Sequence, residues 1–198
     1  MSSLYQQVEQ FVVDAYTNAG KPGTIRHLQR TVYWVEQLRP DADEALRCAA
    51  IAHDIERAFR RVDTEKLIRS SPQGYRDEQF LQIHQEESAK AIAEFLRGQG
   101  VESEFIARVT RLVSRHEIGG DGDQNILKDA DSVSFFENNA DRFLAHWIPM
   151  LGKYGKEKVR AKFQWMFDRI SSEKAREIAR PWYEETMKKL DAQVYNLL

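Results

Sequence analysis

Apolar residues recur every three to four positions along most of the chain, which is the spacing of one face of an α-helix. Glycine, proline and serine interrupt this pattern at a few points and divide it into helix-length segments. The pattern predicts helices over about 4–12, 25–35, 41–59, 80–96 and 105–113, then two or three more from Asp129 onward, the last over about 173–194. No sustained alternation of apolar and polar residues predicts a strand. We therefore expect an all-α fold.

The overall composition limits the class of protein. The chain has 198 residues, 42% of them hydrophobic, which is enough for one domain with a core of ordinary size. A formal net charge of -2 argues against a dedicated nucleic-acid surface, which usually needs a strongly basic domain. The single cysteine, Cys48, excludes a disulfide framework and fits a reducing compartment.

The chain also lacks the sequence features of a membrane or secreted protein. No apolar run approaches the roughly 18 residues of a membrane span, and the first ten residues are polar. We therefore expect a cytoplasmic protein without a membrane or nucleic-acid partner, and the sequence does not determine its oligomeric state.

The segment 46–52 is small and apolar on nearly every side, which is typical of a helix surrounded by close neighbours. It is followed immediately by His53 and Asp54. An ionised carboxylate in such surroundings costs several kcal/mol unless a cation or strong hydrogen-bond donors meet it. We therefore expect a cation or strong hydrogen-bond donors beside Asp54.

Four of the five histidines lie on or beside the apolar stripes of four different predicted helices, and these are His27, His53, His84 and His116. A single histidine in such a position is more often a buried residue whose ring is satisfied by a carbonyl or a carboxylate. Four of them, one with a carboxylate beside it, favour a shared partner. Since transition metals prefer neutral imidazole and carboxylate ligands, the pattern predicts a metal site in the helical core. The fifth histidine, His146, is interpreted as a packing or supporting residue.

Two further acids, Asp129 and Asp131, follow the last of these four histidines and precede the apolar run 133–136. A cap at the start of a new helix explains Asp129. It explains Asp131 less well, because Asp131 shares a helix side with Ser134 and Phe135. We therefore expect Asp131, and not Asp129, to belong to the site.

The order His27, then His53-Asp54, then Asp131 resembles the HD superfamily of metal-dependent phosphohydrolases. The flanking segments are similar as well: Arg26-His27 at a helix start, AAIAHDI over 49–55, HQEESA over 84–89, VSRH over 113–116 and DADSV over 129–133. The resemblance spans about residues 20–140, and the tail over about 172–190 is similar to the closing helix of small bacterial members. It implies an HD-type helical bundle as a single domain over 1–198, with a C-terminal helical extension over about 141–198.

The resemblance also implies a metal centre and its ligands. Its metal would be a divalent transition metal (Mn, Fe, Co, Ni or Zn) or Mg, with one or two ions per chain. A second ion would be bridged to the first by Asp54. The ligands carried over to this chain are His27, His53, Asp54 and Asp131 for one ion, with His84 and His116 matching the extra histidines of members that hold two.

Glu56 and Arg57 stand where many members have Gly and Lys in a His-Asp-x-Gly-Lys string, which argues against the signalling and tRNA-processing subfamilies. Arg57 would then face substrate phosphate, and Asp54 and Arg57 are the expected catalytic residues. Arg60 and Arg61 either help to clamp the phosphate or form a basic helix end. For the basic run over 153–162, a solvated helix face is the favoured interpretation over a surface that steers an anionic substrate.

The leading hypothesis is an enzyme, a metal-dependent phosphohydrolase that acts on a small phosphorylated molecule, with a nucleotide as one candidate. Two alternatives stay open. One is a di-iron oxygenase with the same six ligands, and the other is a non-catalytic helical module that binds a metal or a ligand. The aromatic residues that could line the substrate pocket are Phe59, Tyr75, Phe80, Phe135 and Trp147.

Overall fold

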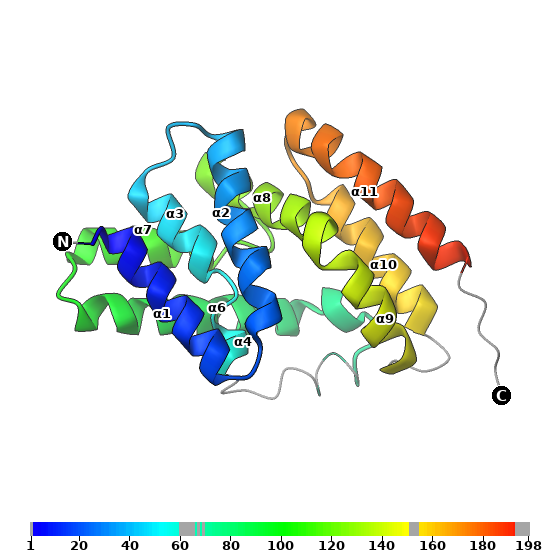
Figure 1. Ribbon diagram of the computed structural model, residues 1–198, viewed down its shortest axis with the longest axis horizontal. Coiled ribbons are helices and arrows are strands. Elements are labelled where there is room, and N and C mark those ends of the chain that lie inside the picture. Colours follow the sequence, from blue (N-terminus) through cyan, green and yellow to red (C-terminus); the bar gives the residue numbers. More distant parts are fainter. Residues whose placement is uncertain (1, 60–65, 67, 69, 151–154, 193–198) are drawn as a thin grey trace.

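Residues 2–59, 66, 68, 70–150 and 155–192 are described by a computed structural model (Figure 1). These residues form α-helices and short 3₁₀ helices over Pro22–Thr24 and Gly74–Arg76, and none of them belongs to a strand. The all-α prediction is therefore confirmed. Every helix in the described part of the chain is too short or too polar to cross a lipid bilayer.

The helices of the N-terminal half enclose one hydrophobic core. They are α1 (Leu4–Asn18), α2 (Ile25–Leu38), α3 (Glu44–Ala52), α6 (Glu78–Gly98) and α7 (Ser103–Val113). Their apolar faces meet around α3, in which residues 48–52 are completely buried. The small side chains that the sequence places on α3 let α1, α2 and α7 approach it from different sides.

The C-terminal half has a second core, rich in aromatic residues, formed by α8 (Gly122–Asn138), α9 (Ala140–Met150), α10 (Gly155–Asp168) and α11 (Glu173–Ala192). Helix α8 lies between the two halves. It packs against α2 on one side and against α9 and α11 on the other (Figure 1). Its polar residues are thus brought next to both halves of the molecule.

The length predicted for the helix over 41–59 is wrong. Helix α3 ends at Ala52, residues 53–55 form a turn, and the short helix α4 (Glu56–Phe59) follows. The hydroxyl of Tyr16 donates a hydrogen bond of 2.6 Å to the carbonyl of Asp54, which supports this turn from α1. The turn is tight, since the backbone N–H of Ile55 donates to the carbonyl of Ala52 at 3.0 Å, and it carries both His53 and Asp54.

The predicted role of Asp129 as a helix cap at the start of its own helix is also wrong. Helix α8 begins at Gly122, where Asp121 and Gln124 form a capping box, so Asp129 lies well inside it. The buried carboxylate of Asp129 instead accepts hydrogen bonds of 2.8 Å from the backbone N–H groups of Ser171 and Ser172. These residues immediately precede α11, and Asp129 therefore anchors the start of that helix from a neighbouring helix.

We expect Asp129→Ala to destabilise the protein by about 1–3 kcal/mol, because it removes the acceptor of two backbone N–H groups at a buried position. The thermal unfolding midpoint should fall by several degrees. Asp41→Ala serves as the control, since the Asp41 side chain is 83% exposed. An unchanged midpoint for Asp129→Ala would contradict the anchoring role.

Candidate metal centre

The four predicted histidines and two predicted aspartates meet in the interior of the protein and form two groups. The first cluster is His27, His53 and Asp131, and the second cluster is Asp54, His84 and His116. All six residues are buried, and within each cluster one ligand atom from every residue lies within 4.8 Å of the others. Each cluster is of a kind that can hold a metal ion.

Helices and turns contribute equally to this arrangement. His27 lies on α2, His84 on α6 and Asp131 on α8. The other three residues lie just beyond helix ends: His53 and Asp54 in the turn after α3, and His116 in the turn after α7. The prediction that His53 and His116 lie on helices is therefore wrong, although both belong to the site.

Two ring nitrogens in the site have no hydrogen-bond partner within the described part of the chain. The Nδ1 of His53 lies 2.8 Å from the carbonyl of Ala50, and the Nδ1 of His116 lies 2.8 Å from that of Val113. A carbonyl only accepts, so each Nδ1 carries the proton. The Nε2 atoms of these two histidines are buried and make no hydrogen bond within the described residues, although carboxylate oxygens lie 3.4 Å from that of His53 and 3.7 Å from that of His116. An unsatisfied nitrogen costs free energy in a protein interior unless a ligand such as a metal fills the position.

The other two histidines are oriented by side chains. The hydroxyl of Ser134 donates to the carbonyl of His27 at 2.8 Å, so its oxygen accepts from the Nδ1 of the same residue at 2.9 Å. In the second cluster, the carboxylate of Glu56 accepts from the Nδ1 of His84 at 2.8 Å. Every one of the four rings therefore directs its Nε2 toward the aspartates, which is the usual orientation of metal-binding histidines with a supporting partner.

The carboxylate of Asp54 faces both clusters. Its Oδ1 lies 2.8 Å from the Nε2 of His84 and 3.7 Å from that of His116. Its Oδ2 lies 3.8 Å from the Nε2 of His53, in the first cluster. Asp54 groups with the second cluster, and its second oxygen is placed to reach an ion in the first.

Arg57 places a cation beside Asp54, which is one of the two kinds of partner expected from the sequence. Its Nη1 lies 3.2 Å from the Oδ2 of Asp54, and its side chain is 34% exposed. Arg57 therefore stands at the edge of the site, where it contacts both a buried carboxylate and solvent. Arg60 and Arg61 lie outside the described residues. His146, interpreted from the sequence as a packing or supporting residue, is exposed and does not belong to the site.

Besides Glu56, two further charged residues that were not evident from the sequence lie around the two clusters. Arg169, just after α10, donates to the carboxylates of Asp131 and Glu117 and to the hydroxyl of Ser132. The Oε1 of Glu117 lies 3.9 Å from the Nε2 atoms of both His84 and His116. The position of Glu117 directly after His116 was a usable signal. Nothing in the sequence around Arg169 pointed to it.

The buried charges shift one another's pKa values. Burial alone would lower the pKa of His53, but the carboxylates of Asp54 and Asp131 raise it to about 9. Burial alone would raise the pKa of Glu117, yet the positive charges of Lys162 and Arg169 lower it to about 2. At neutral pH a metal ion in the first cluster would therefore take the place of a proton on His53.

The five aromatic residues that the sequence suggested for the pocket wall lie in different parts of the structure. The ring of Phe80 stacks on His84 at 5.7 Å between centroids, and Tyr75 contacts Phe80 at 6.0 Å. Phe135 packs against Phe143 within the C-terminal core. The side chain of Trp147 lies outside the described residues. Of the five, Phe80 is thus in direct contact with a histidine of the site.

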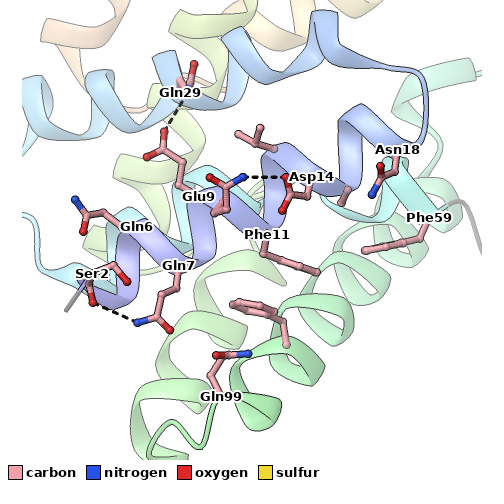
Figure 2. A pocket seen from close by; sticks show the side chains of 14 residues that line it. Ser2, Gln6, Gln7, Glu9, Phe11, Asp14, Asn18, Gln29, Phe59 and Gln99 are labelled. Carbon is pink, nitrogen blue, oxygen red and sulfur yellow. Dashed lines mark hydrogen bonds between the residues drawn. The ribbon is translucent and has the colours of Figure 1, made fainter.

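The fifth candidate, Phe59, lines a surface hollow that is separate from the two clusters. Figure 2 shows this hollow beside α1, with Phe59 near Phe11 and with polar side chains such as Gln7 and Gln99 around it. Phe95 stacks on Phe11 at 4.1 Å between centroids and also lines the hollow. None of the six residues of the two clusters lines it.

The chain matches the family described as "Domain of unknown function (DUF4202)" over residues 9–190. It belongs to the DUF4202 family. The DUF4202 match includes all six residues of the two clusters, and also Glu117 and Arg169 from the surrounding shell of charges. No curated protein and no solved structure matches the chain.

The two aspartates of α8 should differ in their effect on metal content. Asp131→Asn removes a carboxylate charge that lies 3.2 Å from the Nε2 of His27 and 3.4 Å from that of His53. It should therefore lose the ion of the first cluster. Asp129→Asn should retain it, because Asp129 binds backbone N–H groups outside the clusters. Elemental analysis of both variants decides this, and metal loss only in Asp129→Asn would reverse the assignment.

His84→Gln should lower metal content from two ions per chain toward one, since it removes a ligand of the second cluster only. The ion of the first cluster should remain. The measurement is metal stoichiometry after saturation with a single divalent ion and removal of excess. Equal stoichiometry in wild type and His84→Gln would show that the second cluster does not hold a metal through His84.

Proposed function

We propose that this protein is a metal-dependent phosphohydrolase of the HD type, acting on a small phosphorylated molecule in the cytoplasm. The main support is that the buried Nε2 atoms of His53 and His116 make no hydrogen bond in the described part of the chain, and that each lies next to a carboxylate suited to bind the same ion. The placement of Asp54 between the two clusters further supports a pair of ions that share one carboxylate.

The charge balance of the site supports an anionic substrate. Four buried carboxylates lie among the histidines, and these are Asp54, Glu56, Glu117 and Asp131. Arg57 pairs with Asp54, and Arg169 pairs with both Glu117 and Asp131. The fourth acid, Glu56, pairs with His84. In the absence of metal, a proton on His53 supplies part of the remaining positive charge. Two divalent ions in the clusters would make the site positive enough to attract a phosphate dianion.

A bound divalent metal would neutralise phosphoryl oxygens and make water available as a nucleophile near neutral pH. The side chains of the chain have separate tasks around it. Arg57, at the exposed edge, would bind phosphoryl oxygens, for which the planar guanidinium is well suited. Arg169 holds Asp131 and Glu117 in place and keeps the pKa of Asp131 well below its usual value against the effect of burial. The carboxylate of Asp131 therefore stays ionised and available as a ligand.

An oxygenase with two irons would use the same two clusters, so the identity of the metal tests the proposal directly. Protein purified without added metal should be analysed for its elements and for the spectrum of a mixed-valent iron pair. Such a spectrum together with consumption of O₂ would favour the oxygenase. We expect instead hydrolysis of at least one phosphomonoester in a panel that includes nucleotides, with Mn, Co, Ni, Mg or Fe added.

Arg57→Met should lower kcat/KM for the best substrate of that panel by about 10²-fold, because it removes a cation that contacts the phosphoryl group. Metal content should stay at the wild-type level. Arg97→Met is the matched control, since Arg97 is exposed at the far end of α6. Full metal occupancy without hydrolysis of any ester would favour a non-catalytic module.

A further inference from the structure

Lys162 does not belong to a solvated helix face, as its place in the basic run 153–162 predicted. It lies on α10 and is only 6% exposed. Two other lysines of the run are less deeply placed, and their ammonium groups bond backbone carbonyls: Lys156 that of Asp191, and Lys158 that of Ser71. Lys162 therefore needs a separate explanation.

The ammonium group of Lys162 is surrounded by aromatic rings. It lies 4.4 Å from the ring centroid of Trp165 and 5.9 Å from that of Tyr75. Within the described residues it makes no hydrogen bond and no ion pair. Cation–π contacts offset part of the cost of burying this charge, but they satisfy none of its three N–H donors.

Both rings connect Lys162 to the metal centre. The guanidinium of Arg169 lies 4.7 Å from the centroid of the same Trp165, and it binds Asp131 and Glu117. On the other side, Tyr75 contacts Phe80, whose ring stacks on His84. Lys162 therefore stands between two chains of contacts that end at residues of the first and the second cluster.

The charges of the site act on Lys162 as well. The pKa of Lys162 is lowered to about 8, mainly by burial. The guanidinium groups of Arg169 and Arg57 also lower it, while the carboxylates of Glu117 and Asp131 raise it. Both carboxylates are already bonded to Arg169. An additional anion beside Lys162 would thus find a cation whose hydrogen-bonding capacity is still available.

We infer that Lys162 binds the phosphoryl group of the substrate together with Arg57, so that α10 completes the phosphate site of the N-terminal half. This inference rests on the proposed function, since it assigns a phosphate anion to the same site. A phosphate monoester dianion has enough acceptor oxygens to engage the metal centre, the guanidinium and the ammonium at once. The C-terminal helices would then take part in substrate binding as well as in stability.

Binding of inorganic phosphate to the Mn²⁺-loaded protein tests the inference without any need for the substrate. Calorimetric titration should show binding at least about tenfold weaker in Lys162→Met than in wild type, the loss expected for one charge-assisted hydrogen bond. Lys162→Arg should restore most of the affinity because it retains the charge. Lys156→Met, on the same helix, should bind phosphate as wild type does. Metal content should be equal in all four proteins.

Wild-type affinity for phosphate in Lys162→Met would overturn the inference, and so would a loss of metal in that variant, which would make Lys162 a support for Glu117. If Lys162→Met does not fold, mass spectrometry of the wild type after mild acylation gives the answer. Phosphate should protect Lys162 and leave Lys156 unchanged, and equal labelling with and without phosphate would refute the role. Phosphate binding that depends on Lys162 in a protein without hydrolase activity would instead contradict only the proposed function.

Discussion

Ionised carboxylates in the interior of a helical protein are stable only when positive charge meets them, and in this protein Arg169 meets two of them at once. Arg169 directly follows α10. Its guanidinium donates hydrogen bonds to Asp131 on α8 and to Glu117 in the turn after α7. One side chain from the C-terminal half therefore neutralises acids that surround the histidines of the N-terminal half. These bonds therefore link the centre to the C-terminal half, in addition to the packing of α2 on α8.

The precise orientation of the histidines comes from groups that are themselves held in place by backbone structure. The carbonyls of Ala50 and Val113 belong to the last turns of α3 and α7, so the helix ends fix the rings of His53 and His116. Ser134 performs the same task for His27 from α8. Rings that are held through Nδ1 present Nε2 without further rearrangement, and little conformational entropy remains to be lost when a ligand binds.

Much of the helical architecture could be predicted from periodicity, because an amphipathic helix must bury one face and this requirement is local. The ends of helices were less predictable. The sequence around His53 is apolar enough to continue a helix, yet α3 stops at Ala52, and Tyr16 from another helix bonds the turn that follows. Likewise, α8 begins at Gly122, where a local capping box forms. Asp129 therefore lies inside the helix, and its carboxylate accepts hydrogen bonds from the segment that precedes α11.

The sequence by itself determined which residue types gather in the core: histidines and aspartates on otherwise apolar faces have to be buried when those faces pack. The sequence could not determine how these residues are distributed between two clusters. The separation into two clusters, with Asp54 between them, depends on how α2, α3, α6 and α8 pack. Nor could it reveal Arg169 or Lys162, which come from beyond the motifs. Their charges gain a role only when α10 folds back onto the centre, because electrostatic contacts depend on distance in space and leave no periodic trace along the chain.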